Sequence, residues 1–210
     1  MKAQIYSSIS GSNARQYWLC IFVFGLLLLP LASVSLLLCA GNRFVFHGLL
    51  FFTGWFIWTF IEYMAHRFWM HSAKGFSGSG SDSRHQHHHV HPTDIKITSA
   101  NRYLLGFIGI ILILLSAWLN SYFTVFTGLY MGFSGYCFMH FFLHQRWAQY
   151  VFKDLQRFHL YHHCKYPNRC FGVSVTWWDK ILDTSPPAGA SLCQRTIDFF
   201  FGVHRRSAKS

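Results

Sequence analysis

The chain has 210 residues, of which 52% are hydrophobic, 20% are aromatic and only 12% are charged, and its formal net charge is +11. This length is enough for one domain, and the long uninterrupted apolar runs exclude an ordinary water-soluble domain. The positive charge is typical of a membrane protein that faces anionic headgroups. No nucleic acid is expected as a partner, because the sequence offers no soluble basic face.

Four apolar stretches are long enough for a helix to cross the roughly 30 Å hydrocarbon core of a bilayer. The first is too long for the apolar core of a cleaved secretory signal, so it is expected to stay as an anchor. Tight connections at 40–43 and 120–121 join the stretches into two helical hairpins. The predicted fold class is therefore all-α and integral to the membrane, with transmembrane helices at 17–39, 44–64, 103–119 and 122–143.

The distribution of lysine and arginine predicts the orientation. If the amino terminus is cytoplasmic, 17 of the 18 basic residues fall on the cytoplasmic side, and Arg43 alone faces the other side. Both termini are then cytoplasmic. The predicted organisation is a cytoplasmic segment at 1–16, a membrane domain at 17–190 and a basic carboxyl-terminal tail at 191–210.

Ten of the 14 histidines form four spaced clusters along the chain. In the predicted topology all four clusters reach the cytoplasmic edge of the membrane, whereas scattered structural histidines would divide between the two faces. This convergence predicts one histidine-rich metal site, held by a cytoplasmic helical cap. The clusters are His66 and His71; His85, His88 and His89; His140 and His144; and His159, His162 and His163.

The spacing within the clusters favours two ions rather than one. Residues three or four apart lie on one face of a helix, whereas neighbours point about 100° apart. One triplet could therefore serve both ions, for instance with His85 and His89 on one and His88 on the other. His66 and His71 are five apart, so either the helix loosens between them or they bind different ions.

The other residue types narrow the choice of metal. There is no HExxH or CxxC motif, and Asp and Glu number only seven, which argues against a zinc hydrolase, a structural zinc site and a carboxylate-bridged di-iron bundle. Imidazole suits iron, copper, nickel or zinc. A site beside acyl chains needs a redox metal to attack their C–H bonds, which favours iron with dioxygen. A metal-handling membrane protein is the alternative from another class, but the spans of a transporter should carry polar or ionisable residues at mid-depth, and the predicted spans have essentially none.

Four motifs occur in an order that resembles the fatty acid hydroxylase superfamily, in particular its fatty acid 2-hydroxylase branch. The resemblance covers about residues 50–184, and two features depart from that branch, of which the second leaves the substrate open. Cys137 stands where that branch usually has aspartate, and the third motif continues as HQRW from His144, as in the related carotenoid hydroxylases. The motifs are EYxxHRxxxH at 62–71, HxxHHxxPxD at 85–94, Gly135 and Tyr136 followed by His140 and His144, and HxxHH at 159–163 with FGVxxxxWDxxxxT at 171–184.

This resemblance implies a non-haem, dioxygen-dependent lipid monooxygenase with two iron ions, although zinc could replace iron in purified protein. It implies that two electrons come from a separate donor, a b-type cytochrome or a ferredoxin with its reductase. The substrate would be a fatty acid or sphingolipid acyl chain. The membrane would be the endoplasmic reticulum of a eukaryote or the inner membrane of a bacterium. A sterol or carotenoid hydroxylase or desaturase with the same centre remains the alternative, as does a member without activity. The family's catalytic metal ligands correspond to His66, His71, His85, His88, His89, His140, His144, His159, His162 and His163.

Three acidic residues are candidates for orienting these imidazoles: Glu62, Asp94 and Asp179. Glu62 lies four residues before His66 and is the only acid within a predicted span. His47, far from the clusters, is expected to be structural. Trp177 and Trp178 are expected to seat the tail at the membrane interface.

Overall fold

The computed structural model describes residues 43–71, 81–95, 98–118 and 122–202. Within these ranges the secondary structure is helical and contains no strand, as the all-α prediction requires. The predicted segment 1–16 and the predicted first span, 17–39, lie outside the described residues. The chain divides into two compact units, Met1–Met64 with Ile97–Cys137 and Ala65–Lys96 with Phe138–Ser210.

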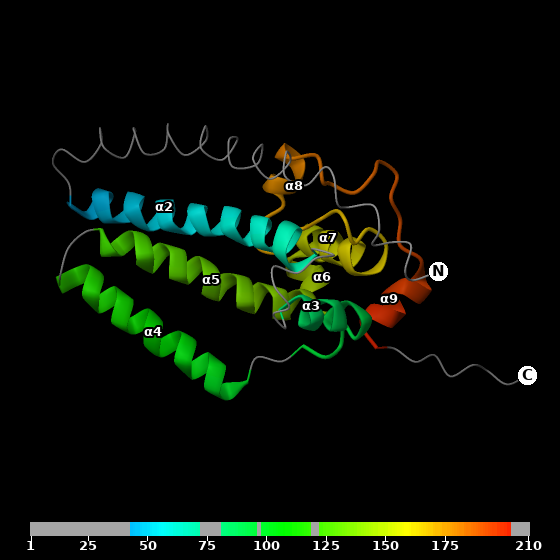
Figure 1. The fold of residues 1–210 in the computed structure, drawn as a ribbon, viewed down its shortest axis with the longest axis horizontal. Coiled ribbons are helices and arrows are strands. Elements are labelled where there is room, and N and C mark those ends of the chain that lie inside the picture. Colours follow the sequence, from blue (N-terminus) through cyan, green and yellow to red (C-terminus); the bar gives the residue numbers. More distant parts are fainter. Residues whose placement is uncertain (1–42, 72–80, 96–97, 119–121, 203–210) are drawn as a thin grey trace, which may run out of the picture. The chain divides into compact units, whose positions relative to one another are not determined.

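The first unit is built from long apolar helices that correspond to three of the predicted spans (Figure 1). They are α2 (Arg43–Met64), α4 (Ser99–Trp118) and the part of α5 (Phe123–Leu143) that precedes Phe138. Of the described helices, only the continuous stretch Arg43–Met70 is long and apolar enough to cross a membrane; Ala100–Leu115 is apolar but shorter. The four-span topology therefore stays a prediction.

Glycines allow α2 and α5 to approach closely, and the two helices run side by side (Figure 1). A Cβ atom on Gly54 would lie 1.9 Å from the carbonyl oxygen of Val125, and one on Gly128 would lie 2.0 Å from that of Phe51. Such contacts are impossible for any residue with a side chain. Small residues at these positions let the two backbones meet, as is common between helices in membranes.

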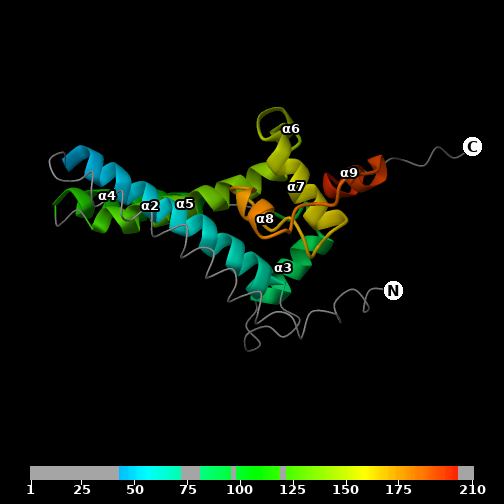
Figure 2. The ribbon, with the colours of Figure 1, turned by 90° about the horizontal axis from the view of Figure 1, so that it is seen from above.

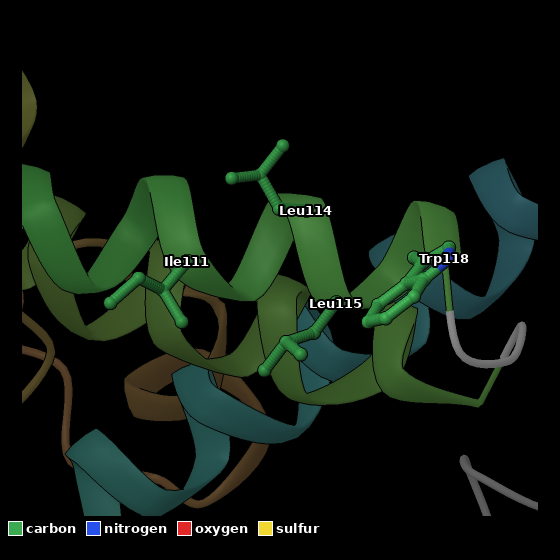
Figure 3. A pocket seen from close by; sticks show the side chains of 4 residues that line it. All are labelled: Ile111, Leu114, Leu115 and Trp118. Atoms are coloured by element: carbon green, nitrogen blue, oxygen red, sulfur yellow. The ribbon is translucent and has the colours of Figure 1, made fainter.

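Helix α4 presents apolar side chains around most of its circumference. Phe107 and Leu114 are each 62% exposed and Trp118 is 85% exposed. A hollow of about 520 Å³ on this helix is lined by Ile111, Leu114, Leu115 and Trp118 (Figure 3). Apolar exposure of this extent would be unfavourable in water and is typical of a helix that faces lipid.

The second unit consists of shorter helices and carries the clustered histidines. A π-helix, η1, directly follows α2, and the last residues of α5 also belong to this unit. Figure 2 shows α9 close to α7. The elements are η1 (Ala65–Met70), α3 (Ser81–Val90), α6 (Ala148–Val151), α7 (Lys153–Cys164), α8 (Trp177–Ile181) and α9 (Gln194–Phe200).

Two features of this unit differ from simple expectation. Trp178 is fully buried, so its predicted role as a membrane-interface anchor is wrong; Trp177 is 37% exposed. Part of the predicted basic tail forms α9, whose Phe200 is only 1% exposed. The buried apolar core therefore includes a residue of the predicted tail, beyond the last motif at 171–184.

Candidate metal centre

The structure brings the ten clustered histidines together in two groups of five. Within each group every residue offers a ring nitrogen, and these nitrogens all lie within 4.8 Å of one another. The groups are neighbours, since the rings of His89 and His163 stack with their centroids 4.2 Å apart. The first group is His66, His71, His85, His89 and His162, and the second is His88, His140, His144, His159 and His163.

Helical periodicity explains how each element serves the two groups. In α3, His85 and His89 are four apart and belong to the first group, while His88 belongs to the second. Helix α7 has the opposite division, because His159 and His163 face the second group and His162 the first. This agrees with the expectation that one triplet addresses two sites.

The five-residue interval between His66 and His71 is accommodated by η1. Its i→i+5 hydrogen bonds make the turn wider than an α-turn, so residues five apart come onto the same side. Both rings accordingly belong to the first group, with their centroids 5.2 Å apart. Of the two predicted alternatives, the structure has the loosened helix, with both rings in one group; that the two rings bind the same ion stays a prediction.

Backbone carbonyl groups orient two rings of the first group. His66 Nδ1 lies 2.6 Å from the carbonyl oxygen of Phe171, and His162 Nδ1 lies 2.8 Å from that of Arg169. A carbonyl oxygen can only accept, so each Nδ1 carries the proton and donates it. In a neutral ring Nε2 then has a bare lone pair. The two lone pairs are directed at the other histidines of the group.

The convergence of these Nε2 atoms fits a metal ion. His85 Nε2 lies 3.1 Å from His66 Nε2, 2.9 Å from His71 Nε2 and 3.0 Å from His89 Nε2. His71 Nε2 is also 3.0 Å from His162 Nε2. A proton on one of these nitrogens can be donated to one neighbour only, so other lone pairs face each other and repel. A cation among them removes that repulsion, and imidazole nitrogen is a common ligand of divalent transition metals.

The second group has the same convergence but different surroundings. His88 Nε2 lies 3.1 Å from His140 Nε2 and 3.2 Å from His144 Nε2, which in turn is 2.9 Å from His159 Nε2. Within the described part of the chain, the buried Nδ1 atoms of His159 and His163 have no hydrogen-bond partner. The rings of His159 and His163 are therefore held mainly by packing, whereas the backbone of Pro92 interacts with His144.

Burial and the neighbouring imidazoles keep these rings neutral. Desolvation is the main cause that lowers the pKa of His71 to about 2 and the pKa of both His89 and His144 to about 3. The pKa of His88 falls only to about 4, because the charge of exposed Asp94 opposes the effect of burial. Burial and the neighbouring imidazoles also hold the pKa values of four further rings well below 6.5: those of His85, His159, His162 and His163. At neutral pH all of these residues offer the deprotonated nitrogen that a metal requires.

Asp179 organises the loop that supplies the carbonyl groups. Its Oδ1 accepts from the backbone N–H of Phe171 at 2.8 Å and from the Thr184 hydroxyl at 2.7 Å, and its Oδ2 accepts from the N–H of Gly172 at 2.9 Å. A Cβ atom on Gly172 would lie 2.0 Å from the carbonyl oxygen of Val175, which explains the glycine. Burial raises the pKa of Asp179 to about 6, although these hydrogen bonds oppose the shift. The carboxylate thus acts on His66 through the loop.

The remaining candidates divide as follows. Glu62 is 3% exposed in α2, and its predicted role in orienting an imidazole stays a prediction. His47 belongs to neither group; its Nδ1 lies 2.8 Å from Thr124 Oγ1, which is a structural contact within the first unit. Sequence reasoning missed Phe200, which packs on the second group, although the cluster of phenylalanines at 199–201 in an otherwise basic tail is a signal that could have indicated it.

Comparison with known proteins finds a family model and relatives that are all named as fatty acid or fatty acyl hydroxylases. The family model "Fatty acid hydroxylase" matches residues 51–184. The chain is 28% identical over 167 residues to a dihydroceramide fatty acyl 2-hydroxylase of Arabidopsis thaliana, with 75% of this chain and 70% of that protein covered. It is also 28% identical over 159 residues to a ceramide very long chain fatty acid hydroxylase of Schizosaccharomyces pombe, with 71% of this chain but only 46% of that protein covered.

The solved structure of full-length scs7p, in which only the hydroxylase domain is visible, is 25% identical and aligns with a TM-score of 0.48 over 85% of this chain and 69% of that chain. The family match spans more than half of the present sequence and contains all ten histidines of the two groups. The chain belongs to the fatty acid hydroxylase family.

Proposed function

We propose that this chain is a membrane-bound, non-haem di-iron oxygenase that hydroxylates a lipid acyl chain with dioxygen and two electrons. The observation that carries the proposal is the pair of neighbouring five-histidine groups, each with ring nitrogens within 4.8 Å of one another, in a member of this family. Two separate convergences of neutral imidazole suit two metal ions better than one.

The first ion would be held by the first group, and the second ion by the second group. When bound, two iron ions would supply the redox chemistry that activates dioxygen toward an unactivated C–H bond. Zinc could occupy the same groups in purified protein, because it binds nitrogen sites more tightly than Fe²⁺ does.

The contribution of the chain itself is to prepare and protect the ligands. The carbonyl groups of Phe171 and Arg169 accept the Nδ1 protons of His66 and His162, which sets the tautomer and the ring orientation. Burial keeps water from the rings of both groups, since His162 of the first group is 0% exposed and His159 of the second is 1% exposed. Excluding water also protects a reactive site from side reactions.

The substrate and its setting are part of the proposal. The similar proteins are named as hydroxylases of ceramide or dihydroceramide acyl chains, which supports a fatty acid or sphingolipid acyl chain here. The apolar helix α2 in the stretch Arg43–Met70 would span the membrane, and the bias of basic residues would place the histidines, from His66 at the end of that stretch onward, on the cytoplasmic side. Electrons would come from a separate donor, a b-type cytochrome or a ferredoxin with its reductase.

Lipid analysis of cells with and without the chain tests this function. We expect hydroxylated acyl chains to accumulate when the intact chain is expressed. His162→Ala in the first group and His88→Ala in the second should each abolish the product, whereas His47→Ala, outside both groups, should retain it. All variants are compared at equal membrane abundance.

The same experiment distinguishes the competing functions. Altered sterols or carotenoids with unchanged acyl chains would refute acyl hydroxylation and support an oxygenase or desaturase of those lipids. The continuation of the third motif as HQRW is the feature that favours this second function. Unchanged lipids together with altered cellular metal content would instead indicate a metal-handling protein.

A further inference from the structure

Helix α9 places one aromatic ring directly on the second histidine group. Phe200 is 1% exposed, whereas its neighbour Phe199 is 53% exposed. The Phe200 ring stacks on the His144 imidazole, with centroids 4.5 Å apart and an interplanar angle of 21°. It also lies 5.4 Å from the ring of His163 and 6.1 Å from that of His159. One side chain thus touches three of the five members of the group.

Specific contacts attach the segment that carries Phe200 to the end of α7. Arg157 and the Tyr161 hydroxyl both donate to the carbonyl oxygen of Ala190. Lys165 Nζ donates to the carbonyl oxygen of Ser191 at 2.9 Å. These contacts come just before α9 and keep it against the helix that supplies His159 and His163. The whole segment lies beyond residue 184, where the family match ends.

The two histidine groups differ in what orients their rings. In the first group, carbonyl groups accept the Nδ1 protons of His66 and His162. In the second, the backbone of Pro92 interacts with His144, but the Nδ1 atoms of His159 and His163 are buried without a hydrogen-bond partner among the described residues. The orientation of these two rings depends on packing, and Phe200 provides an apolar surface against which they and the His144 ring pack.

We propose that Phe200 is a positioning residue for the second group: its ring fixes the His144 imidazole and closes the group to water, so that an ion held there depends on α9. An ion held by the first group does not depend on α9. This inference rests on the metal centre of the proposed function and adds that the two sites are unequal.

Metal release from the purified full-length chain tests the inference without an activity measurement. The chain is loaded with Co²⁺, excess EDTA is added, and the visible absorption of the imidazole-bound Co²⁺ is followed with time. His71→Ala and His88→Ala, each with one group damaged, identify which phase of release belongs to which group. Phe200→Ala should accelerate release from the second group roughly 10-fold to 100-fold, because removal of a residue that supports a metal ligand typically lowers metal affinity by this factor and we expect the loss to lie in the dissociation rate. It should also shift the absorption of that phase and leave the first group unchanged.

The matched control is Phe199→Ala, which removes the same side chain from the exposed side of the same helix and should leave both phases unchanged. If Phe200→Ala does not fold, Phe200→Leu retains apolar volume and loses the stacked ring, and it should show the same selective acceleration. Unchanged release in a folded Phe200 variant, or equal acceleration of both phases, would overturn the proposal. So would a wild-type chain that binds no Co²⁺. A chain that passes this test but produces no hydroxylated lipid would contradict the proposed function alone.

Discussion

Removal of the Asp179 carboxylate should damage the first histidine group and spare the second. The carboxylate is fully buried and accepts two hydrogen bonds from the backbone of the loop whose carbonyl groups orient His66 and His162, and a third from the Thr184 hydroxyl. Alanine at this position leaves the backbone N–H groups of Phe171 and Gly172 without their acceptor. The loop must then move to find new partners, and the two carbonyl acceptors move with it.

The size of the effect follows from these contacts. A buried donor without an acceptor costs about 1–3 kcal/mol, so two N–H groups cost about 2–6 kcal/mol of the free energy of unfolding. For a chain of this length each kcal/mol lowers the melting temperature by roughly 2–4 °C. Loss of the support behind two ligands should weaken metal binding by the first group roughly 10-fold to 100-fold.

The assay combines thermal melting in detergent with Co²⁺ release to EDTA. Asp179→Ala should lower the melting temperature and accelerate release from the first group selectively. Asp183→Asn, which removes an exposed charge four residues along the chain, is the control and should change neither property. An Asp179→Ala chain that releases both ions at the wild-type rate would refute the idea that this carboxylate positions the loop.

Three further predictions concern packing and protons. Gly172→Ala should prevent stable folding, because its Cβ atom would lie 2.0 Å from a backbone oxygen. Gly135→Ala, whose Cβ atom would meet nothing within 4 Å, should fold normally. The yield of folded protein is the measurement. Gly54→Ala should force α2 and α5 apart and lower the melting temperature, since its Cβ would lie 1.9 Å from a carbonyl oxygen, while Gly48→Ala should be neutral or slightly stabilising. The stability of the metal-free protein should depend on pH, because burial holds the pKa of His89 at about 3 in the fold against 6.5 in the unfolded chain. The unfolded chain then binds more protons, so the stability of the metal-free protein is complete above about pH 6.5 and falls as the pH drops toward 3. Melting of EDTA-treated protein between about pH 8 and about pH 5 checks this, and a constant melting temperature would contradict it.

Local patterns in the sequence were sufficient to predict the long apolar helices and the ten histidines that the fold gathers into two groups. The predicted spans 44–64, 103–119 and 122–143 coincide with α2, α4 and α5 to within a few residues, because an apolar run of this length has few other ways to satisfy its backbone. Histidine spacing likewise predicted how α3 divides its rings between two groups, since a helix converts an interval of three or four residues into a shared face.

Tertiary structure alone decided what surrounds those rings. His66 meets the carbonyl oxygen of a residue 105 positions away, and every residue has a carbonyl group, so no side-chain pattern identifies this acceptor. The choice of a π-turn between His66 and His71 depends on which group the second ring joins. The burial of Phe200 against His144 depends on a backbone path through residues 185–193 that has no periodic pattern. Composition and spacing determine which groups are available along each helix, but packing between distant segments determines which of them face one another.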